Sequence, residues 1–401
     1  MTHTSIDTQC CIAGGGPAGT MLGLLLARAG VDVVVLEKHA DFFRDFRGDT
    51  IHPSTLDLID SLGLRARFEA IPHSRITTLD VVINGTRLTP VNFSTLRGPN
   101  RHIALMPQWD FLTLLAEEAA LQPGFRLLMD TEADGVLRDG TRIAGVHATG
   151  PDGDLAIHAP LTIAADGRAS AVRASVGLVP RDYGVPADVL WFRLPAPPHP
   201  PPDTLGYVGG GTLVITIPRP GYFQMGVLIP KGAFAAIRDA GLPAFRTRVC
   251  RSAPFLAPVV PALADWEQVK LLSIQVNRLH QWWVPGLLCI GDAAHAMSPV
   301  FGVGVNYAVQ DAVAAARLLA QPLRMGADTD PLLARIQNRR ERPVRLMQPL
   351  QLRVHAALDN GLQGTDQPLT PWQKRAVGMA LPLLRPVLAR LVGRGFRPEK
   401  L

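Results

Sequence analysis

Three glycines near the N-terminus have the spacing of a phosphate-binding turn. Gly14, Gly16 and Gly19 fit the pattern G-x-G-x-x-G, with Pro17 and Ala18 between the last two. The first glycine permits a tight turn, the second lets a pyrophosphate approach the backbone, and the third lets a helix pack close to a strand. Pro17 suits the first turn of a helix, where its missing N–H costs little. The spacing therefore predicts a site for a dinucleotide pyrophosphate.

The segments around this turn predict the β-α-β unit that positions it. Residues 9–13 and 31–36 are short apolar runs typical of buried parallel strands, and residues 17–29 form the helix between them. The N-terminal amides of this helix would point at the phosphates. Glu37 follows the last glycine by eighteen residues, where a carboxylate can accept hydrogen bonds from a ribose, and we assign Lys38 to the same site. A glycine-rich turn without a ligand is the alternative.

A second polar turn lies about 280 residues further along the chain. Asp292 follows the apolar run 286–290, so its carboxylate would stand at the end of a buried strand and accept a hydrogen bond from a ligand hydroxyl. A helix cap is the alternative role for this residue. His295 is interpreted as a structural hydrogen-bonding residue rather than a base. We predict that the backbone of the loop with Pro299, Gly302 and Gly304 closely approaches a ligand. This loop leads into a helix that begins near Val305 and Asn306.

The composition is typical of a globular protein and does not favour nucleic-acid binding or a metal site. With 401 residues, 47% hydrophobic and 18% charged, the chain can bury a large core in two closely joined domains. The formal charge is +6, but only five of the 40 basic residues are lysine and no Lys/Arg-rich block occurs, so nucleic-acid binding is not expected. The four cysteines form no Cys-x-x-Cys pair, so neither a redox disulfide motif nor a metal site is predicted.

Residues 8–27 contain no charged side chain, as a membrane span or signal peptide would. Three consecutive glycines and Pro17 interrupt this stretch, and no Lys or Arg precedes it. The nucleotide-binding interpretation explains the stretch better, and we therefore expect a cytoplasmic protein.

The remaining patterns predict an α/β chain. Strands are predicted within 76–93, 125–164, 205–230 and 266–280, with a hairpin turn at Asn84-Gly85. Helices are predicted over 53–62, 108–120, 233–250 and 305–319, followed from residue 331 by a mostly helical tail broken at Pro343, Pro349, Pro382 and Pro386. Only one dinucleotide fingerprint occurs, so a second nucleotide-binding domain is not expected.

Together these separated motifs resemble the single-component FAD-dependent aromatic hydroxylases, the para-hydroxybenzoate hydroxylase-like group. The resemblance covers most of residues 8–345. It rests on the glycine turn with Glu37, on the segment from Asp292 to Asn306, and on three further motifs. These are Phe46-Arg47-Gly48-Asp49, Gln108 at the start of a helix, and Ala165-Asp166-Gly167-Arg168.

The resemblance implies FAD as the cofactor and NADH or NADPH as a transient co-substrate. It places Arg47 beside the FAD and the incoming nicotinamide, and Gln108 near the ribityl region. Asp166 belongs to the family's Asp-Gly motif, Asp292 would meet the ribityl chain, and the helix start near Val305 would meet the pyrimidine edge of the flavin. Each side chain also has a structural alternative: a surface position for Arg47, a helix cap for Gln108 and a turn for Asp166.

The implied architecture is a Rossmann-like FAD-binding domain interleaved with a mixed β-sheet substrate domain, followed by C-terminal helices. We assign the FAD-binding domain to 1–75, 100–178 and 276–345, the substrate domain to 76–99 and 179–275, and the helical region to 346–401.

The implied activity is a monooxygenase that uses NAD(P)H and O2 to hydroxylate an aromatic or quinone-like small molecule, as a monomer or homodimer. His102, Tyr207, Tyr222 and Gln224 are candidates to face the ring, although structural roles are preferred for each, and no catalytic acid or base is assigned. An FAD-dependent dehydrogenase or double-bond reductase is the alternative within the class. A non-catalytic flavin-binding redox sensor is the alternative from another class.

The C-terminal tail has an unusual charge pattern. Residues 371–398 contain no acidic residue, and Leu384, Leu388 and Leu391 fall on one helical face. We expect this face to pack on the FAD-binding domain, with an apolar substrate or a membrane surface as the alternative contact.

Overall fold

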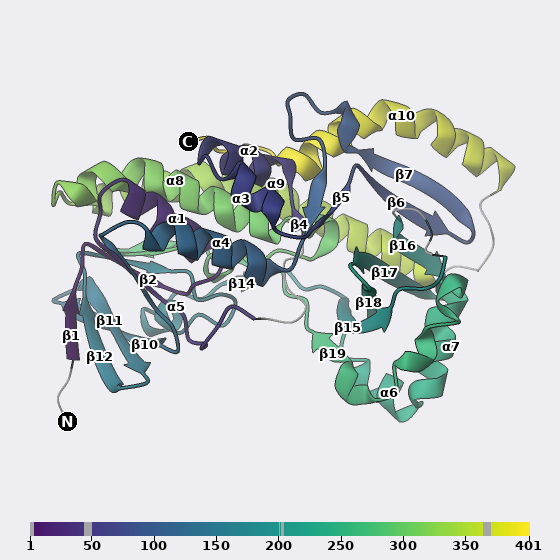
Figure 1. Cartoon of the computed structure of the whole chain (residues 1–401), viewed down its shortest axis with the longest axis horizontal. Coiled ribbons are helices and arrows are strands. Elements are labelled where there is room, and N and C mark those ends of the chain that lie inside the picture. The colour runs from purple at the N-terminus through teal and green to yellow at the C-terminus, as the bar shows by residue number, and fades with distance from the viewer. Residues whose placement is uncertain (1–3, 44–49, 200, 202–203, 364–369) are drawn as a thin grey trace.

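Two β-sheets, each covered by helices, organise the chain (Figure 1). The structure is a computed structural model that describes residues 4–43, 50–199, 201, 204–363 and 370–401. Its α-helices are α1 (Pro17–Arg28), α2 (Pro53–Ser61), α3 (Arg65–Ala70), α4 (Gln108–Ala120), α5 (Ala171–Ser175), α6 (Phe234–Asp239), α7 (Leu242–Ser252), α8 (Gly304–Arg324), α9 (Asp330–Gln363) and α10 (Pro371–Arg394).

The first sheet contains the predicted β-α-β unit. Across the described residues its order is β21 (Trp283–Val284), β22 (Leu287–Cys289), β13 (Leu161–Ala164), β2 (Cys10–Ala13), β3 (Val33–Leu36) and β9 (Phe125–Leu128). All neighbouring pairs are parallel except β21 with β22. The parallel strands β2, β3, β13 and β22 are buried along their length, as their apolar sequences predict. Their carboxyl ends meet at one edge, where the polar turns after β2, β13 and β22 come together.

The second sheet forms the other half of the molecule. In the described part of the chain its order is β19 (Lys270–Leu272), β15 (Ala187–Pro195), β18 (Tyr222–Pro230), β17 (Thr212–Arg219), β16 (Thr204–Gly209), β6 (Thr78–Ile83) and β7 (Thr86–Asn92). It is a mixed sheet, because β16 pairs with β6 in parallel while the other pairs are antiparallel. The predicted Asn84-Gly85 turn joins β6 and β7, with both residues at positive φ. Helices α6 and α7 lie against one face of this sheet (Figure 1).

Smaller sheets complete the described structure. One contains β1 (Thr4–Asp7), β12 (Gly153–His158), β11 (Arg142–Gly150) and β10 (Glu132–Asp139); another contains β4 (Thr50–Ile51), β8 (Ile103–Leu105) and β5 (Ser74–Ile76); a third pairs β14 (Arg181–Asp182) with β20 (Asn277–Arg278). The predicted fold class, a Rossmann-like domain interleaved with a mixed sheet and followed by helices, is confirmed.

The tail corrects one prediction. Helix α9 continues through Pro343 and Pro349, and α10 continues through Pro382 and Pro386, so the prolines do not end these helices. An internal proline costs about 3 kcal/mol, because it removes one backbone hydrogen bond and crowds the preceding turn. Burial of the α9 side chains Ile336, Val344 and Met347 offsets this cost. Helix α9 also crosses the boundary predicted at residues 345 and 346, and the domain division otherwise stays a prediction.

Candidate active site

A cavity of about 480 Å³ extends from the carboxyl edge of the first sheet to one face of the second. Most predicted cofactor residues line it: Gly14, Gly16, Pro17, Ala18, Glu37, Lys38, Gln108, Asp166, Asp292, Pro299, Gly302, Gly304 and Val305. Gly19 and Asn306 are not among its lining residues, and Arg47 lies outside the described residues. The structure thus brings together segments that are almost three hundred residues apart.

Two close backbone approaches shape the glycine turn. A Cβ atom on Gly14, whose φ is +110°, would lie 2.4 Å from the carbonyl oxygen of Ala165. A Cβ on Gly19 would lie 1.9 Å from the Gly14 carbonyl oxygen, so α1 can approach the turn only without a side chain there. A Cβ on Gly16 would meet no atom of the described residues within 4 Å. Helix α1 begins here without a side-chain cap, which leaves its first amides available to an anion in that open space.

Glu37 supports the turn from the end of β3. Its Oε2 accepts a hydrogen bond from the Gly15 N–H at 3.2 Å, and its Oε1 accepts one from the His39 N–H at 3.2 Å. The carboxylate is buried and lines the cavity, so it is fixed where a ribose hydroxyl can reach it. Contact with the ribose stays a prediction. Lys38 lies at the mouth of the site, where its Nζ pairs with Glu132 at 3.3 Å.

Asp166 provides an unsatisfied acceptor in the cavity wall. Its Oδ2 accepts a hydrogen bond from the Val172 N–H at 3.2 Å, whereas its buried Oδ1 has no hydrogen-bond partner among the described residues. Burial raises the pKa of Asp166, although nearby hydrogen-bond donors partly oppose the rise. A buried carboxylate oxygen without a partner is costly, so this atom is suited to accept a hydrogen bond from a bound molecule.

Two arginines connect the segment that contains Asp166 to the segment that contains Asp292. Arg173, on α5 after the Asp-Gly motif, donates from Nη1 to the Ala293 carbonyl oxygen at 2.9 Å. Arg168 Nε lies 3.9 Å from Asp292 Oδ2, and the Asp292 side chain is 44% exposed. Asp292 therefore stands in the open cavity at the end of β22, as predicted, and can accept a hydrogen bond from a ligand hydroxyl.

The loop after this turn has an unusual backbone. Phe301 and Gly302 both have positive φ, 68° and 63°, and a Cβ on Gly302 would lie 2.4 Å from Thr50 Oγ1. The left-handed region is costly for a bulky residue such as Phe301, and Phe301 lines the cavity. The loop delivers the start of α8 to the cavity at Gly304, without a side-chain cap, so the first amides of α8 are available to a group with negative charge.

Asn306 has a different surrounding from the one expected. Its Oδ1 accepts hydrogen bonds from Thr55 Oγ1 at 2.5 Å and from the His52 N–H at 3.3 Å. The side chain therefore fixes α2 against α8. The contact predicted for the backbone amides near Val305 and Asn306 stays a prediction.

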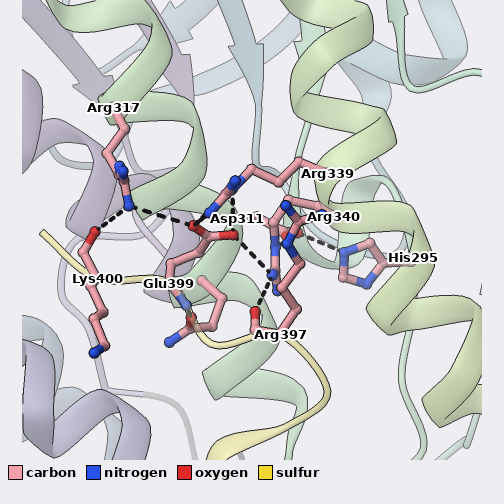
Figure 2. A network of polar contacts seen from close by, with 9 residues as sticks. His295, Asp311, Arg317, Arg339, Arg340, Arg397, Glu399 and Lys400 are labelled. Atoms are coloured by element: carbon pink, nitrogen blue, oxygen red, sulfur yellow. Dashed lines mark hydrogen bonds and ion pairs between the residues drawn. The ribbon is translucent and has the colours of Figure 1, made fainter.

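A buried ionic network centred on Asp311 contacts the turn at Gly291. Figure 2 shows Asp311 with His295 and Arg340. Asp311 on α8 accepts hydrogen bonds from the Gly291 N–H at 3.1 Å and from Arg340 Nε at 2.8 Å, and its Oδ2 lies 2.6 Å from His295 Nε2. Burial alone would raise the pKa of Asp311, but His295 and Arg340 outweigh that effect and hold it below its ordinary value. His295 thus occupies the structural position that was predicted for it.

The same network fixes the end of the tail. Arg340 on α9 donates to the Arg397 carbonyl oxygen at 3.0 Å, and its Nη1 lies 3.5 Å from Glu399 Oε1 (Figure 2). Arg339 pairs with Glu399 at 2.6 Å. The turn that carries Asp292 is therefore held by α8, α9 and the tail together.

The second sheet supplies an apolar half of the cavity. Val189 and Trp191 on β15 line it, as do Leu213, Ile215 and Ile217 on β17. Alternate residues share one face of a strand, so the neighbours of these side chains point toward α6 and α7 instead. The sequence did not distinguish the two faces, because both are apolar.

A polar pair formed by His355 and Ser298, which no sequence pattern predicted, also lines the cavity. His355 of α9 lies with Nε2 2.6 Å from Ser298 Oγ, which itself accepts a hydrogen bond from the Val300 N–H. This arrangement favours a hydroxyl that donates to Nε2 and a neutral imidazole with its proton on Nδ1. Burial lowers the pKa of His355, which also favours the neutral form. Only proximity in space reveals this pair, because 57 residues separate its members.

The four candidates for the substrate ring lie elsewhere: His102, Tyr207, Tyr222 and Gln224 are absent from the cavity lining. Tyr207 packs against Phe255 with ring centroids 4.9 Å apart, on the face that α7 covers. Gln224 is buried and donates to the Phe192 carbonyl oxygen at 2.8 Å. The structural roles preferred for Tyr207 and Gln224 agree with these positions.

Comparison with known proteins gives the class. A family described as FAD binding domain matches residues 7–349. The chain is 31% identical over 319 residues to 6-methylpretetramide 4-monooxygenase from Streptomyces rimosus, which covers 79% of this chain and 76% of the relative. It is 23% identical over 335 residues to para-nitrophenol 4-monooxygenase from Pseudomonas sp. (strain WBC-3). The aligned region covers 80% of this chain and 80% of that relative. The chain belongs to the FAD binding domain family, and its activity is that of an FAD-dependent monooxygenase.

A solved structure agrees with the fold. The crystal structure of pqsL, a probable FAD-dependent monooxygenase from Pseudomonas aeruginosa, matches with a TM-score of 0.75 at 24% identity, covering 88% of this chain and 97% of that chain. This likeness shows the fold, whereas the family match and the 31% identical monooxygenase confirm the resemblance to FAD-dependent aromatic hydroxylases and FAD as the cofactor.

The cavity fits FAD at three independent places. The open space at the Cβ position of Gly16 can hold the pyrophosphate. Asp166 Oδ1, which has no partner among the described residues, can accept a hydrogen bond from the cofactor. The start of α8 at Gly304 has no side-chain cap, so its amides can face the flavin. When bound, FAD supplies the redox chemistry that links NAD(P)H oxidation to O2 activation. The protein's part is to hold the cofactor, exclude water and orient the substrate.

Replacing Asp292 with alanine should weaken FAD binding by about 1–3 kcal/mol, the range for a lost hydrogen bond to a charged group. The variant should remain folded, because an ion pair as exposed as that with Arg168 contributes little to stability. Titration of the FAD-free protein, followed by flavin fluorescence, measures the affinity, and thermal unfolding without FAD is the control. Unchanged FAD affinity in a folded variant would refute the proposed contact.

Proposed function

We propose that the protein hydroxylates an aromatic small molecule whose ring system lies against the apolar face of the second sheet. The observation that carries the proposal is the continuity of the cavity, which runs from the glycine turn to Trp191 and its aliphatic neighbours. An aromatic ring buries a large apolar area and packs well against another aromatic surface. The relatives named above act on 6-methylpretetramide and on para-nitrophenol, which supports an aromatic substrate.

A hydroxyl group on the substrate would suit the polar pair formed by His355 and Ser298. His355 Nδ1 has no hydrogen-bond partner among the described residues, so a neutral His355 with its proton there would have a hydrogen bond to donate to a phenol oxygen. That contact would orient the substrate ring without placing a charge in an apolar cavity. NAD(P)H would bind transiently, and a pyrophosphate contact with Arg47 remains a prediction.

Labelled dioxygen provides the decisive test. Phenols are first screened for those that accelerate NAD(P)H oxidation by the FAD-loaded protein, and the product is then formed under ¹⁸O2 and analysed by mass spectrometry. We expect one labelled oxygen atom in the product and none when ¹⁸O is supplied only as water. A product that lacks the label, or that forms equally well without oxygen, would support the dehydrogenase or reductase alternative. No turnover with any phenol would favour the redox-sensor alternative.

A further inference from the structure

Helix α10 presents an apolar outward face. Trp372, Met379, Leu383 and Val387 are 76%, 63%, 81% and 64% exposed. Their spacing of seven, four and four residues places them on one side of the helix. Side chains of this size are rarely exposed together on a soluble protein, and such a patch marks an interaction site.

The opposite side of α10 is firmly attached to the protein. Ala389 and Val392 are buried there, and Arg385 Nε donates to the Thr89 carbonyl oxygen at 2.9 Å. At the C-terminal end of the helix, Arg394 pairs with Asp57 at 3.2 Å. The helix lies along β7 at the margin of the second sheet (Figure 1). Of the predicted packing face, Leu388 and Leu391 are partly buried against the core clusters, whereas Leu384 is 50% exposed. The outward face is therefore a separate surface, which this inward packing leaves uncovered.

The charges on α10 distinguish the possible partners. No Asp or Glu occurs between residues 371 and 398, while Arg375 and Arg390 are exposed beside the apolar face. An interface between two copies through this face would contain arginines from both helices and no carboxylate from either helix. Like charges at an interface oppose association. An anionic surface would instead attract both arginines.

We propose that α10 docks the protein on an anionic phospholipid surface, with Trp372, Met379, Leu383 and Val387 inserted among the lipids. An apolar face flanked by arginines is the pattern of a helix that lies in the membrane interface. Among the described residues, Arg375–Arg394 is long and apolar enough to cross a membrane. Its attachment to β7 and its polar contacts favour a helix that lies on the surface instead. Helix α10 follows the segment matched by the FAD-binding family, which ends at residue 349.

The test is sedimentation of the full-length, FAD-loaded protein with vesicles of phosphatidylcholine alone or with phosphatidylglycerol. We expect binding to the anionic vesicles at low salt, at least tenfold weaker binding to the neutral ones, and loss of binding at high salt. The double substitution Leu383→Asp and Val387→Asp should reduce binding to anionic vesicles at least tenfold. Leu121→Asp, which changes a 70% exposed leucine elsewhere on the surface, should leave it unchanged.

Two further measurements keep the result interpretable. FAD content and circular dichroism establish that each variant is folded, and quenching of tryptophan fluorescence by brominated lipid should fall in Trp372→Phe. Absence of binding to anionic vesicles at low salt would overturn the proposal. A dimer in sedimentation velocity that dissociates on Leu383→Asp, without vesicle binding, would show instead that the face joins two copies of the chain.

Discussion

Replacing Gly16 with valine should abolish FAD binding and leave the protein folded. The backbone of Gly16 has a φ of −73°, which any residue can adopt, and in the part of the chain that the structure describes a Cβ there would meet no atom within 4 Å. The branched side chain would instead fill the space in which the pyrophosphate is expected. We expect the FAD affinity to fall by at least about 100-fold, or roughly 3 kcal/mol. The FAD content of the purified protein and titration of the FAD-free form measure the effect.

Two other glycines provide matched controls. Gly378 on α10 also has open space around its Cβ position but lies outside the cavity lining, so Gly378→Val should keep its FAD. Gly19→Ala should lower the stability of the FAD-free protein, because its Cβ would lie 1.9 Å from a backbone oxygen. The assigned role of Gly16 is wrong if Gly16→Val binds FAD as tightly as the unaltered protein.

The residues that we predicted to hold the cofactor could be identified in the sequence because their constraints are local, and their contacts with FAD stay predictions. A glycine that must meet a backbone atom, or an aspartate that ends a buried strand, leaves a mark within a few residues. Gly14, Gly16 and Asp292 were found in this way, and the structure places all three in the cavity wall. The parallel arrangement of β2, β13 and β22 then brings distant turns to the same edge.

The substrate half was not predicted, because its constraints are not local. Strand β15 is buried on both faces over most of its length, so alternation of apolar and polar residues cannot show that Trp191 rather than Phe192 faces the cavity. His355 lies on a helix that we expected the prolines to interrupt, and its partner Ser298 is 57 residues away. Aromatic and polar side chains such as Tyr207 stood out by residue type alone, which does not report the direction in which they point.

Neutralising Asp311 should cause the largest loss of stability among the predicted substitutions. Asp311→Asn keeps the shape of the side chain but removes the negative charge that faces buried Arg340 and His295. Breaking a buried pair by removing one partner costs about 3–5 kcal/mol, because the other charge stays in a region of low polarity. Urea denaturation of the FAD-free protein at pH 7 measures the free energy of unfolding. Glu117→Gln, which removes an exposed partner of Arg67, should cost less than about 1 kcal/mol.

The pH dependence gives this prediction a second test. The folded-state pKa of Asp311 lies below its ordinary value, so the carboxylate stabilises the fold above the unfolded pKa, about 3.9. That contribution is lost as the pH falls through the lower, folded-state pKa. The stability difference between the protein and Asp311→Asn should therefore be present at pH 7 and shrink below about pH 4. A difference that is absent at pH 7, or equally large at pH 3, would contradict an ionised Asp311 as the centre of the network. Because the same carboxylate holds the Gly291 N–H, the variant should also bind FAD more weakly while it is still folded.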